Sequence, residues 1–149
     1  MKINFLVSLL LLAGFSLPTK AQTEDSNAEI AQITATLMDY IEGTANGEPE
    51  RLRRAFHPDF NLYTVTNDTL WTRSGEAYIA NIKVGEKNSR EGRIISIDYE
   101  KDAAMAKAEI VIPNWRIFTD YFLLLKYEGS WKIVQKSYTY RPFPKKEEE

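Results

Sequence analysis

The second half of the chain consists of four long strand-like segments separated by breaks of only two or three residues. The segments span residues 93–100, 103–112, 115–127 and 131–140. Turn residues such as Lys101-Asp102 and Glu128-Gly129 lie between them. Connections this short join antiparallel neighbours, because a parallel pair needs a crossover of about a dozen residues or more. The sequence therefore predicts a sheet made of consecutive antiparallel hairpins.

The second of these segments has one apolar face lined by small side chains. Successive residues of a strand point to opposite faces of the sheet. One face of this segment carries Ala104, Ala106, Ala108, Ile110 and Ile112. Small side chains on a long curved sheet leave room for a helix to approach, so we expect a helix to pack on this face.

The segment that precedes this sheet is predicted to be mainly helical. Residues 26–45 carry apolar side chains at helical spacing. Ser26 and Glu29 have the spacing of a capping box, which predicts that the helix begins at Ser26. Asn46-Gly47 is typical of a helix end, because both residues tolerate the left-handed backbone conformation.

Two further helices and a hairpin are predicted before the sheet. Pro49 suits the first turn of a second helix that extends to Phe56. A short hairpin follows, with strands near residues 60–65 and 70–73, and Ser74 is the expected N-cap of a third helix. The polar, glycine-flanked stretch 85–92 is predicted to be an exposed loop.

This order of elements predicts an α+β domain. Three N-terminal helices should pack on a strongly curved antiparallel sheet and form a cone with an internal pocket. We expect the domain to occupy residues 22–143, and the charged tail at residues 144–149 to be disordered.

The N-terminus has the layout of a secretory signal peptide. Lys2 precedes an apolar run over residues 5–15, and small residues before Gln22 suit a cleavage site after residue 21. A membrane anchor is the alternative, but a spanning helix needs about 20 apolar residues, and this run has about half of them. We therefore expect an exported protein, periplasmic or secreted, with no membrane span in the mature chain.

Composition excludes several classes of function. The chain has no cysteine, and His57 is its only histidine, so thiol catalysis is excluded and a zinc site lacks ligands. Lys2 and Lys20 are the only charged residues of the predicted signal peptide, which leaves 17 basic against 21 acidic residues. This net negative charge does not favour nucleic acid as a partner. No metal and no cofactor are predicted.

Four motifs resemble a known family when they are taken in order along the chain. They are Tyr40-Ile41-Glu42-Gly43, residues 51–59, residues 118–121 and Trp131-Lys132-Ile133-Val134. The chain resembles the nuclear transport factor 2-like superfamily, which includes SnoaL-like proteins and ketosteroid isomerase, and in particular its lumazine-binding branch. The resemblance implies a cone-shaped fold, a pocket for a small aromatic or heterocyclic molecule, and a homodimer.

The candidate site residues follow from this pocket. The aromatic side chains expected to line it are Tyr40, Tyr63, Trp71, Tyr78, Trp115 and Phe118. His57 suits general base catalysis because its ordinary pKa lies near 6.5, although a histidine at a helix end often only binds backbone carbonyls. Asp120 lies between phenylalanines on one strand face, where a carboxylate is costly to bury unless it is paired or used.

The direction of Asp120 depends on the turn at Glu128-Gly129. A two-residue turn would point Asp120 into the pocket together with Gln135, whereas a three-residue turn would point it outward. We favour the two-residue turn. In both registers Lys136 should lie on the face opposite to Asp120.

No known catalytic set is recognisable, so we favour a small-molecule-binding domain without an assigned reaction. A lyase or isomerase that uses His57 or Asp120 for proton transfer is the first alternative. The second is a homodimeric interaction module with a vestigial pocket, assembled through a convex sheet face that bears Val111, Tyr138 and Tyr140.

Overall fold

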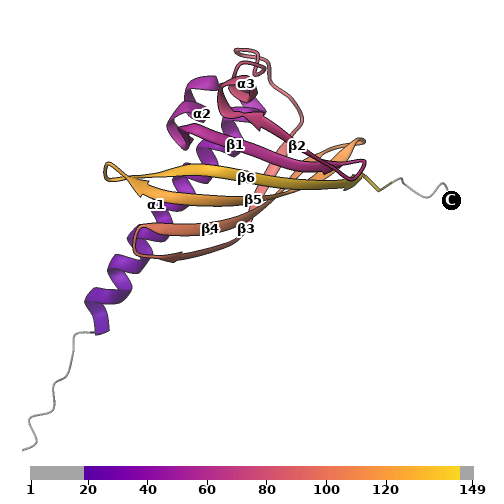
Figure 1. Ribbon diagram of the computed structural model, residues 1–149. Helices are drawn as coiled ribbons and strands as arrows, with labels where there is room; N and C mark the ends of the chain where they lie inside the picture. The colour runs from indigo at the N-terminus through magenta and orange to yellow at the C-terminus, as the bar shows by residue number, and fades with distance from the viewer. Residues whose placement is uncertain (1–18, 145–149) are drawn as a thin grey trace, which may run out of the picture.

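The computed structural model describes residues 19–144 as three helices and six strands (Figure 1). The helices are α1 (Thr19–Asn46), α2 (Pro49–Ala55) and α3 (Gly75–Ile79). The strands are β1 (Phe56–Thr66), β2 (Thr69–Ser74), β3 (Glu91–Glu100), β4 (Ala103–Ile112), β5 (Arg116–Tyr127) and β6 (Ser130–Pro142). The predicted α+β class is confirmed. Most of the predicted signal peptide, residues 1–18, and the tail from residue 145 lie outside the described residues.

All six strands form one sheet in the order β2-β1-β6-β5-β4-β3. The predicted hairpins β3–β4, β4–β5 and β5–β6 are present and antiparallel. Strand β1 pairs with β6 in parallel, which brings the first hairpin to the edge of the long sheet. Through that parallel pairing, β1 and β2 extend the sheet beyond β6.

Helix α1 runs diagonally across the inner face of the sheet, behind the strands in the view of Figure 1. The predicted small-residue face of β4 lies on this inner side, and the alanines at positions 104, 106 and 108 are buried there in the same core cluster as Ile41 of α1. Gly92 of β3 shows how close the approach is, because a Cβ atom added there would lie 2.6 Å from Cγ2 of Ile41. Small residues therefore set the distance between helix and sheet.

The predicted caps have different outcomes. Ser74 caps α3 as expected, and its side chain accepts a hydrogen bond from the Ala77 N–H at 3.3 Å. The capping box at Ser26 is wrong, because α1 already begins at Thr19 and Ser26 lies inside the helix. The Glu29 carboxylate instead accepts hydrogen bonds from Lys126 and Trp131 of the sheet. A tertiary contact has replaced the local one.

The β5–β6 hairpin has the predicted two-residue turn. Glu128 and Gly129 have φ angles of 48° and 76°, and Tyr127 pairs with Ser130. Positive φ at both central residues is the geometry of the tight turns that suit a twisted hairpin. This turn determines which face each residue of β5 occupies.

A β-bulge then changes the faces of β6. Leu124 pairs with Ile133 but Leu123 pairs with Gln135, so Val134 is an extra residue in β6. The expected facing of Lys136 is therefore wrong: it lies on the inner face with Asp120.

None of the helices within residues 19–144 is both long and apolar enough to cross a membrane.

Candidate functional site

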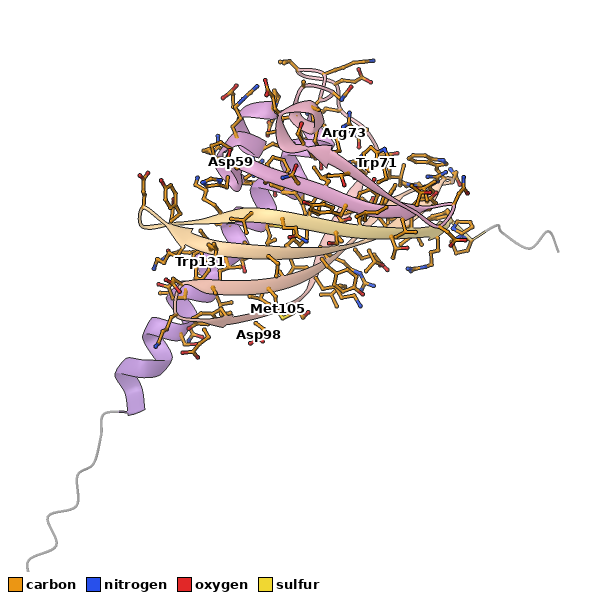
Figure 2. All side chains as sticks on the ribbon, viewed as in Figure 1. Asp59, Trp71, Arg73, Asp98, Met105 and Trp131 are labelled. Carbon is orange, nitrogen blue, oxygen red and sulfur yellow. The ribbon has the colours of Figure 1, made fainter. Side chains whose placement is uncertain are left out.

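A cavity of about 160 Å³ lies on the inner side of the sheet and is lined by residues from both halves of the chain. Its aromatic lining consists of Tyr40, Trp71, Tyr78, Trp115, Phe118 and Tyr138. Its charged lining consists of Arg73, Arg90, Asp120 and Lys136, and Leu62 and Ile110 complete the wall. Trp71 and Arg73 come from the edge strand β2 (Figure 2). Aromatic walls with a few convergent polar groups are typical of small-molecule sites.

Tyr40, Asp120 and Lys136 form a hydrogen-bonded cluster at the inner wall of this cavity. The Tyr40 hydroxyl donates to Asp120 Oδ2 at 2.6 Å. The Lys136 ammonium donates to the same Oδ2 atom at 2.9 Å and to the Tyr40 oxygen at 2.9 Å. Asp120 is 1% and Lys136 5% exposed, so the ion pair is almost completely removed from water.

The second oxygen of Asp120, Oδ1, is buried and has no hydrogen-bond partner among the described residues. A buried acceptor without a donor costs about 1–3 kcal/mol, and more for a charged group. Tyr40 and Lys136 both donate to Oδ2, so Oδ1 is the unpaired acceptor of this cluster.

Lys136 also lies over three tyrosine rings. Its Nζ atom is 4.9 Å from the ring centroid of Tyr40, 5.8 Å from that of Tyr78 and 4.8 Å from that of Tyr138. These distances allow cation–π attraction. An ammonium has three N–H donors, and the two hydrogen bonds to Asp120 and Tyr40 use two of them.

Two tyrosine hydroxyls of the cavity are held in the protonated form. Burial raises the pKa of Tyr40 well above its ordinary value, and the charge of Asp120 raises it further. Burial, followed by the charge of Asp120, also raises the pKa of Tyr138. Both side chains are therefore neutral hydrogen-bond donors at physiological pH.

The cavity brings together most of the residues that the sequence singled out. Six of them line it: Tyr40, Trp71, Tyr78, Trp115, Phe118 and Asp120. Asp120 faces inward, as the two-residue turn predicts. The binding role of these residues stays a prediction.

His57, Tyr63 and Gln135 do not line this cavity. His57 borders a separate hollow with Pro58 and accepts a local hydrogen bond from the Asp59 N–H at 3.2 Å. Tyr63 neighbours the inward-facing Leu62 on β1 and points to the other side of the strand.

Gln135 borders a hollow on the outer face together with Leu123, because the bulge at Val134 exchanges the faces of Gln135 and Lys136. The same shift brings Tyr138, expected on the convex face, into the cavity. No local sequence signal marks this bulge.

Arg73 and Arg90 are site residues that the sequence analysis missed. Arg73 is two residues from Trp71 on β2, so strand alternation could have placed both on one face. Arg90 comes from the segment before β3, and only tertiary contacts bring it to the cavity.

Comparison with known proteins agrees with the fold and the motifs. The family model described as "Putative lumazine-binding" matches residues 28–139. The chain belongs to this family, within the nuclear transport factor 2-like superfamily.

Two solved structures and one characterised protein illustrate the similarity. An NTF2-like protein of unknown function from Silicibacter pomeroyi has a TM-score of 0.69 and 27% identity, covering 78% of this chain and 98% of that one. Another, from Shewanella baltica, has a TM-score of 0.68 and 27% identity, covering 85% and 100%. In sequence, the chain is 27% identical over 117 residues to aldolase FrzH of Cladobotryum sp., covering 74% of this chain and 90% of the aldolase.

Proposed function

We propose that this protein binds a small aromatic or heterocyclic molecule in the inner cavity. The observation that carries the proposal is the Asp120 Oδ1 atom, a buried acceptor without a partner at the wall of an aromatic-lined cavity. Burying an unpaired carboxylate oxygen is unfavourable for folding alone. A ligand that donates a hydrogen bond to this oxygen would remove that cost.

Screening by ligand-detected NMR tests this proposal with phenols, aromatic acids, pterins and flavins. Ile110 lines the cavity, so Ile110→Phe should fill it and abolish binding of any true cavity ligand. Its neighbour Val111 lies on the other side of β4, and Val111→Phe is the matched control that should leave binding intact. A screen without hits, or hits that Ile110→Phe does not displace, would contradict the proposal.

Proton transfer next to a carbonyl group is the second candidate function, and Asp120 rather than His57 is the residue that supports it. A general base needs a free lone pair within reach of the substrate. Asp120 lines the cavity and has unpaired lone pairs on Oδ1, whereas His57 borders a different hollow. The similarity to an aldolase points in the same direction, because an aldol addition begins with removal of such a proton.

The step would proceed as follows in this site. Asp120 Oδ1 takes the proton from the carbon beside the carbonyl, and the C–H electron pair forms the C=C bond of an enolate. The remaining N–H of Lys136 can stabilise the enolate oxygen. In an aldol addition the enolate carbon then bonds to a second carbonyl carbon, and the new alkoxide recovers the proton from Asp120.

Deuterium exchange tests this candidate without knowledge of the natural substrate. Small aryl ketones and aldehydes with an α-hydrogen are incubated with the protein in D₂O, and loss of the α-proton signal is followed by NMR. Exchange that falls at least about a hundredfold in Asp120→Asn, in line with the usual contribution of a general base, but persists in His57→Gln would support the candidate. Equal exchange in Asp120→Asn would rule out this role.

Export and dimerisation are further proposals for this chain. The sequence of residues 1–21 supports export, and a mature protein that begins at Gln22, identified by mass spectrometry, would establish cleavage. Exposed apolar side chains on the outer face, at Met105, Tyr121 and Leu123, support a homodimer. Sedimentation equilibrium should give a dimer mass, and Leu123→Glu should convert it to a monomer; a monomer at all concentrations would contradict this.

A further inference from the structure

The cavity has an excess of positive charge that the Asp120 cluster does not explain. Its charged lining residues are Arg73, Arg90, Asp120 and Lys136. Lys136 and Asp120 neutralise each other through their ion pair at 2.9 Å. Within residues 26–144, whose side chains the structure describes, neither arginine forms an ion pair with a carboxylate, so the cavity lining carries two guanidinium charges beyond the Lys136–Asp120 pair.

Arg90 is held in position by the segment that precedes it. The Asn88 N–H donates to the Ala45 carbonyl, and its side-chain amide donates to the Thr44 carbonyl, both at 2.9 Å. These bonds fasten the segment to the end of α1. The Asn88 side-chain oxygen then accepts the Arg90 N–H at 3.0 Å.

The guanidinium of Arg90 has a buried donor without an acceptor. Its Nε atom is removed from solvent and makes no hydrogen bond to any described residue. An unpaired buried N–H of a charged group is costly, as is the unpaired Oδ1 of Asp120. Two residues that line one cavity, Arg90 and Asp120, thus each have a buried polar atom without a hydrogen-bond partner among the described residues.

Arg73, on the edge strand β2, supplies the second positive charge of the cavity lining. It lies across from the cavity residue Leu62 in the β1–β2 pairing. Its guanidinium carbon is 6.0 Å from the ring centroid of Tyr78, within reach of cation–π attraction. Two guanidinium groups that line one cavity can hold a carboxylate through several charge-assisted hydrogen bonds.

The size of the cavity limits the rest of the ligand. Its volume is about 160 Å³, and an engineered protein cavity of about 150 Å³ binds benzene. The enclosed part of a ligand is therefore one ring, which the tyrosine and tryptophan side chains can contact on its faces and edges.

We infer that Arg90 and Arg73 form an anion subsite, and that the ligand is a single-ring aromatic acid whose ring also carries a hydrogen-bond donor for Asp120. The inference rests on the proposed binding function and specifies its ligand class. A hydroxybenzoate is the simplest molecule of this class: its carboxylate meets the arginines and its hydroxyl meets Oδ1.

Isothermal titration of the full chain with 4-hydroxybenzoate and 4-hydroxybenzyl alcohol tests the inference. The two probes share the ring and the phenol, but only the first carries a charge. We expect the acid to bind at least about tenfold more tightly, as a charge-assisted hydrogen bond implies. Arg90→Gln should reduce this difference, because it weakens binding of the acid, for which only Arg73 then remains, and leaves binding of the alcohol unchanged.

Arg93→Gln is the matched control, because Arg93 is three residues away and pairs with Glu109 at the surface. It should leave both affinities unchanged. Equal affinity of the two probes, unaffected by Arg90→Gln, would overturn the anion subsite. If Ile110→Phe then abolished the binding of both probes, the proposed binding function would still hold. Failure of both probes to bind would overturn the inference and count against the aromatic cavity ligand as well.

Discussion

Two carboxylate–lysine clusters connect the same three elements, α1, β5 and β6, and they differ in how the carboxylate oxygens are used. The first joins Glu29 of α1 to Lys126 of β5 and Trp131 of β6. The second joins Tyr40 of α1 to Asp120 of β5 and Lys136 of β6. Each cluster ties the long helix to the central hairpin of the sheet.

The difference lies in how the carboxylate oxygens are used. Glu29 receives one donor on each oxygen, from Lys126 at 2.6 Å and from the Trp131 indole at 2.8 Å. Asp120 receives both donors on Oδ2 and, from the part of the chain that the structure describes, none on Oδ1, although it is more deeply buried. The first cluster is complete as a structural contact. In the second cluster one carboxylate oxygen has no partner among the described residues, and its residue, Asp120, lines the cavity.

This contrast distinguishes a structural contact, the Glu29 cluster, from a candidate binding site, the Asp120 cluster. Folding alone favours satisfied buried polar groups, so most of them in native proteins have partners. An unsatisfied carboxylate oxygen beside an aromatic cavity is therefore better explained by an external partner than by stability. The following predictions test the contrast, beginning with the largest effect.

The largest effect should come from Lys136→Met. It removes the buried cation and leaves Asp120 as an uncompensated charge, which typically costs about 3–5 kcal/mol of unfolding free energy. Urea denaturation measures the loss. The double variant Asp120→Leu with Lys136→Met removes both charges and should recover most of the stability. A single-variant loss below about 1 kcal/mol would show that the pair is not buried as described.

A smaller effect is expected on the ionisation of Tyr138. Burial and the charge of Asp120 both raise the pKa of this hydroxyl. Asp120→Asn removes the charge but not the burial, so the pKa should fall part of the way toward its ordinary value. NMR titration of ring-labelled tyrosine in the two proteins measures the change, with Asp98→Asn, at a site outside the cavity, as the control. An unchanged Tyr138 pKa would contradict the electrostatic contact.

The smallest effect is expected from Glu29→Gln, because this cluster is partly exposed. Hydrogen bonds from Lys126 and then Trp131 lower the pKa of Glu29. A lowered pKa in the folded state stabilises the protein above the unfolded value near 4.3, and this contribution disappears as the pH falls through the folded pKa. The variant should therefore be less stable than the parent at pH 7 and equally stable near pH 2.

Thermal unfolding across this range measures the difference between the two proteins. Ligand binding in the cavity should be the same in both. A Glu29→Gln variant that lost ligand binding while it remained folded would remove the distinction between the two clusters.

The sequence predicted the fold well because the deciding signals are local. Glu128-Gly129 specifies its own two-residue turn, and Ser74 caps the helix that directly follows it. These signals established the hairpins and the facing of Asp120. The predicted start of α1 at Ser26 is wrong, and Glu29 makes a distant contact with the sheet in place of the local cap.

The site was predicted only in part because its remaining residues depend on tertiary structure. The bulge at Val134 brings Lys136 inward in place of Gln135, and the hairpin pattern gives no sign of it. Arg90 reaches the cavity because the Asn88 side chain binds the Thr44 carbonyl at the end of α1. Thr44 precedes Asn88 by 44 residues in the sequence. Alternation along a strand cannot predict either event.

A crystal structure of the protein soaked with 4-hydroxybenzoate tests the central claim most directly, because it shows what lies beside Asp120 Oδ1. We predict that the aromatic ring occupies the cavity and that its hydroxyl lies within hydrogen-bond distance of this oxygen. A structure in which a protein donor binds Oδ1 and side chains fill the cavity would contradict the account.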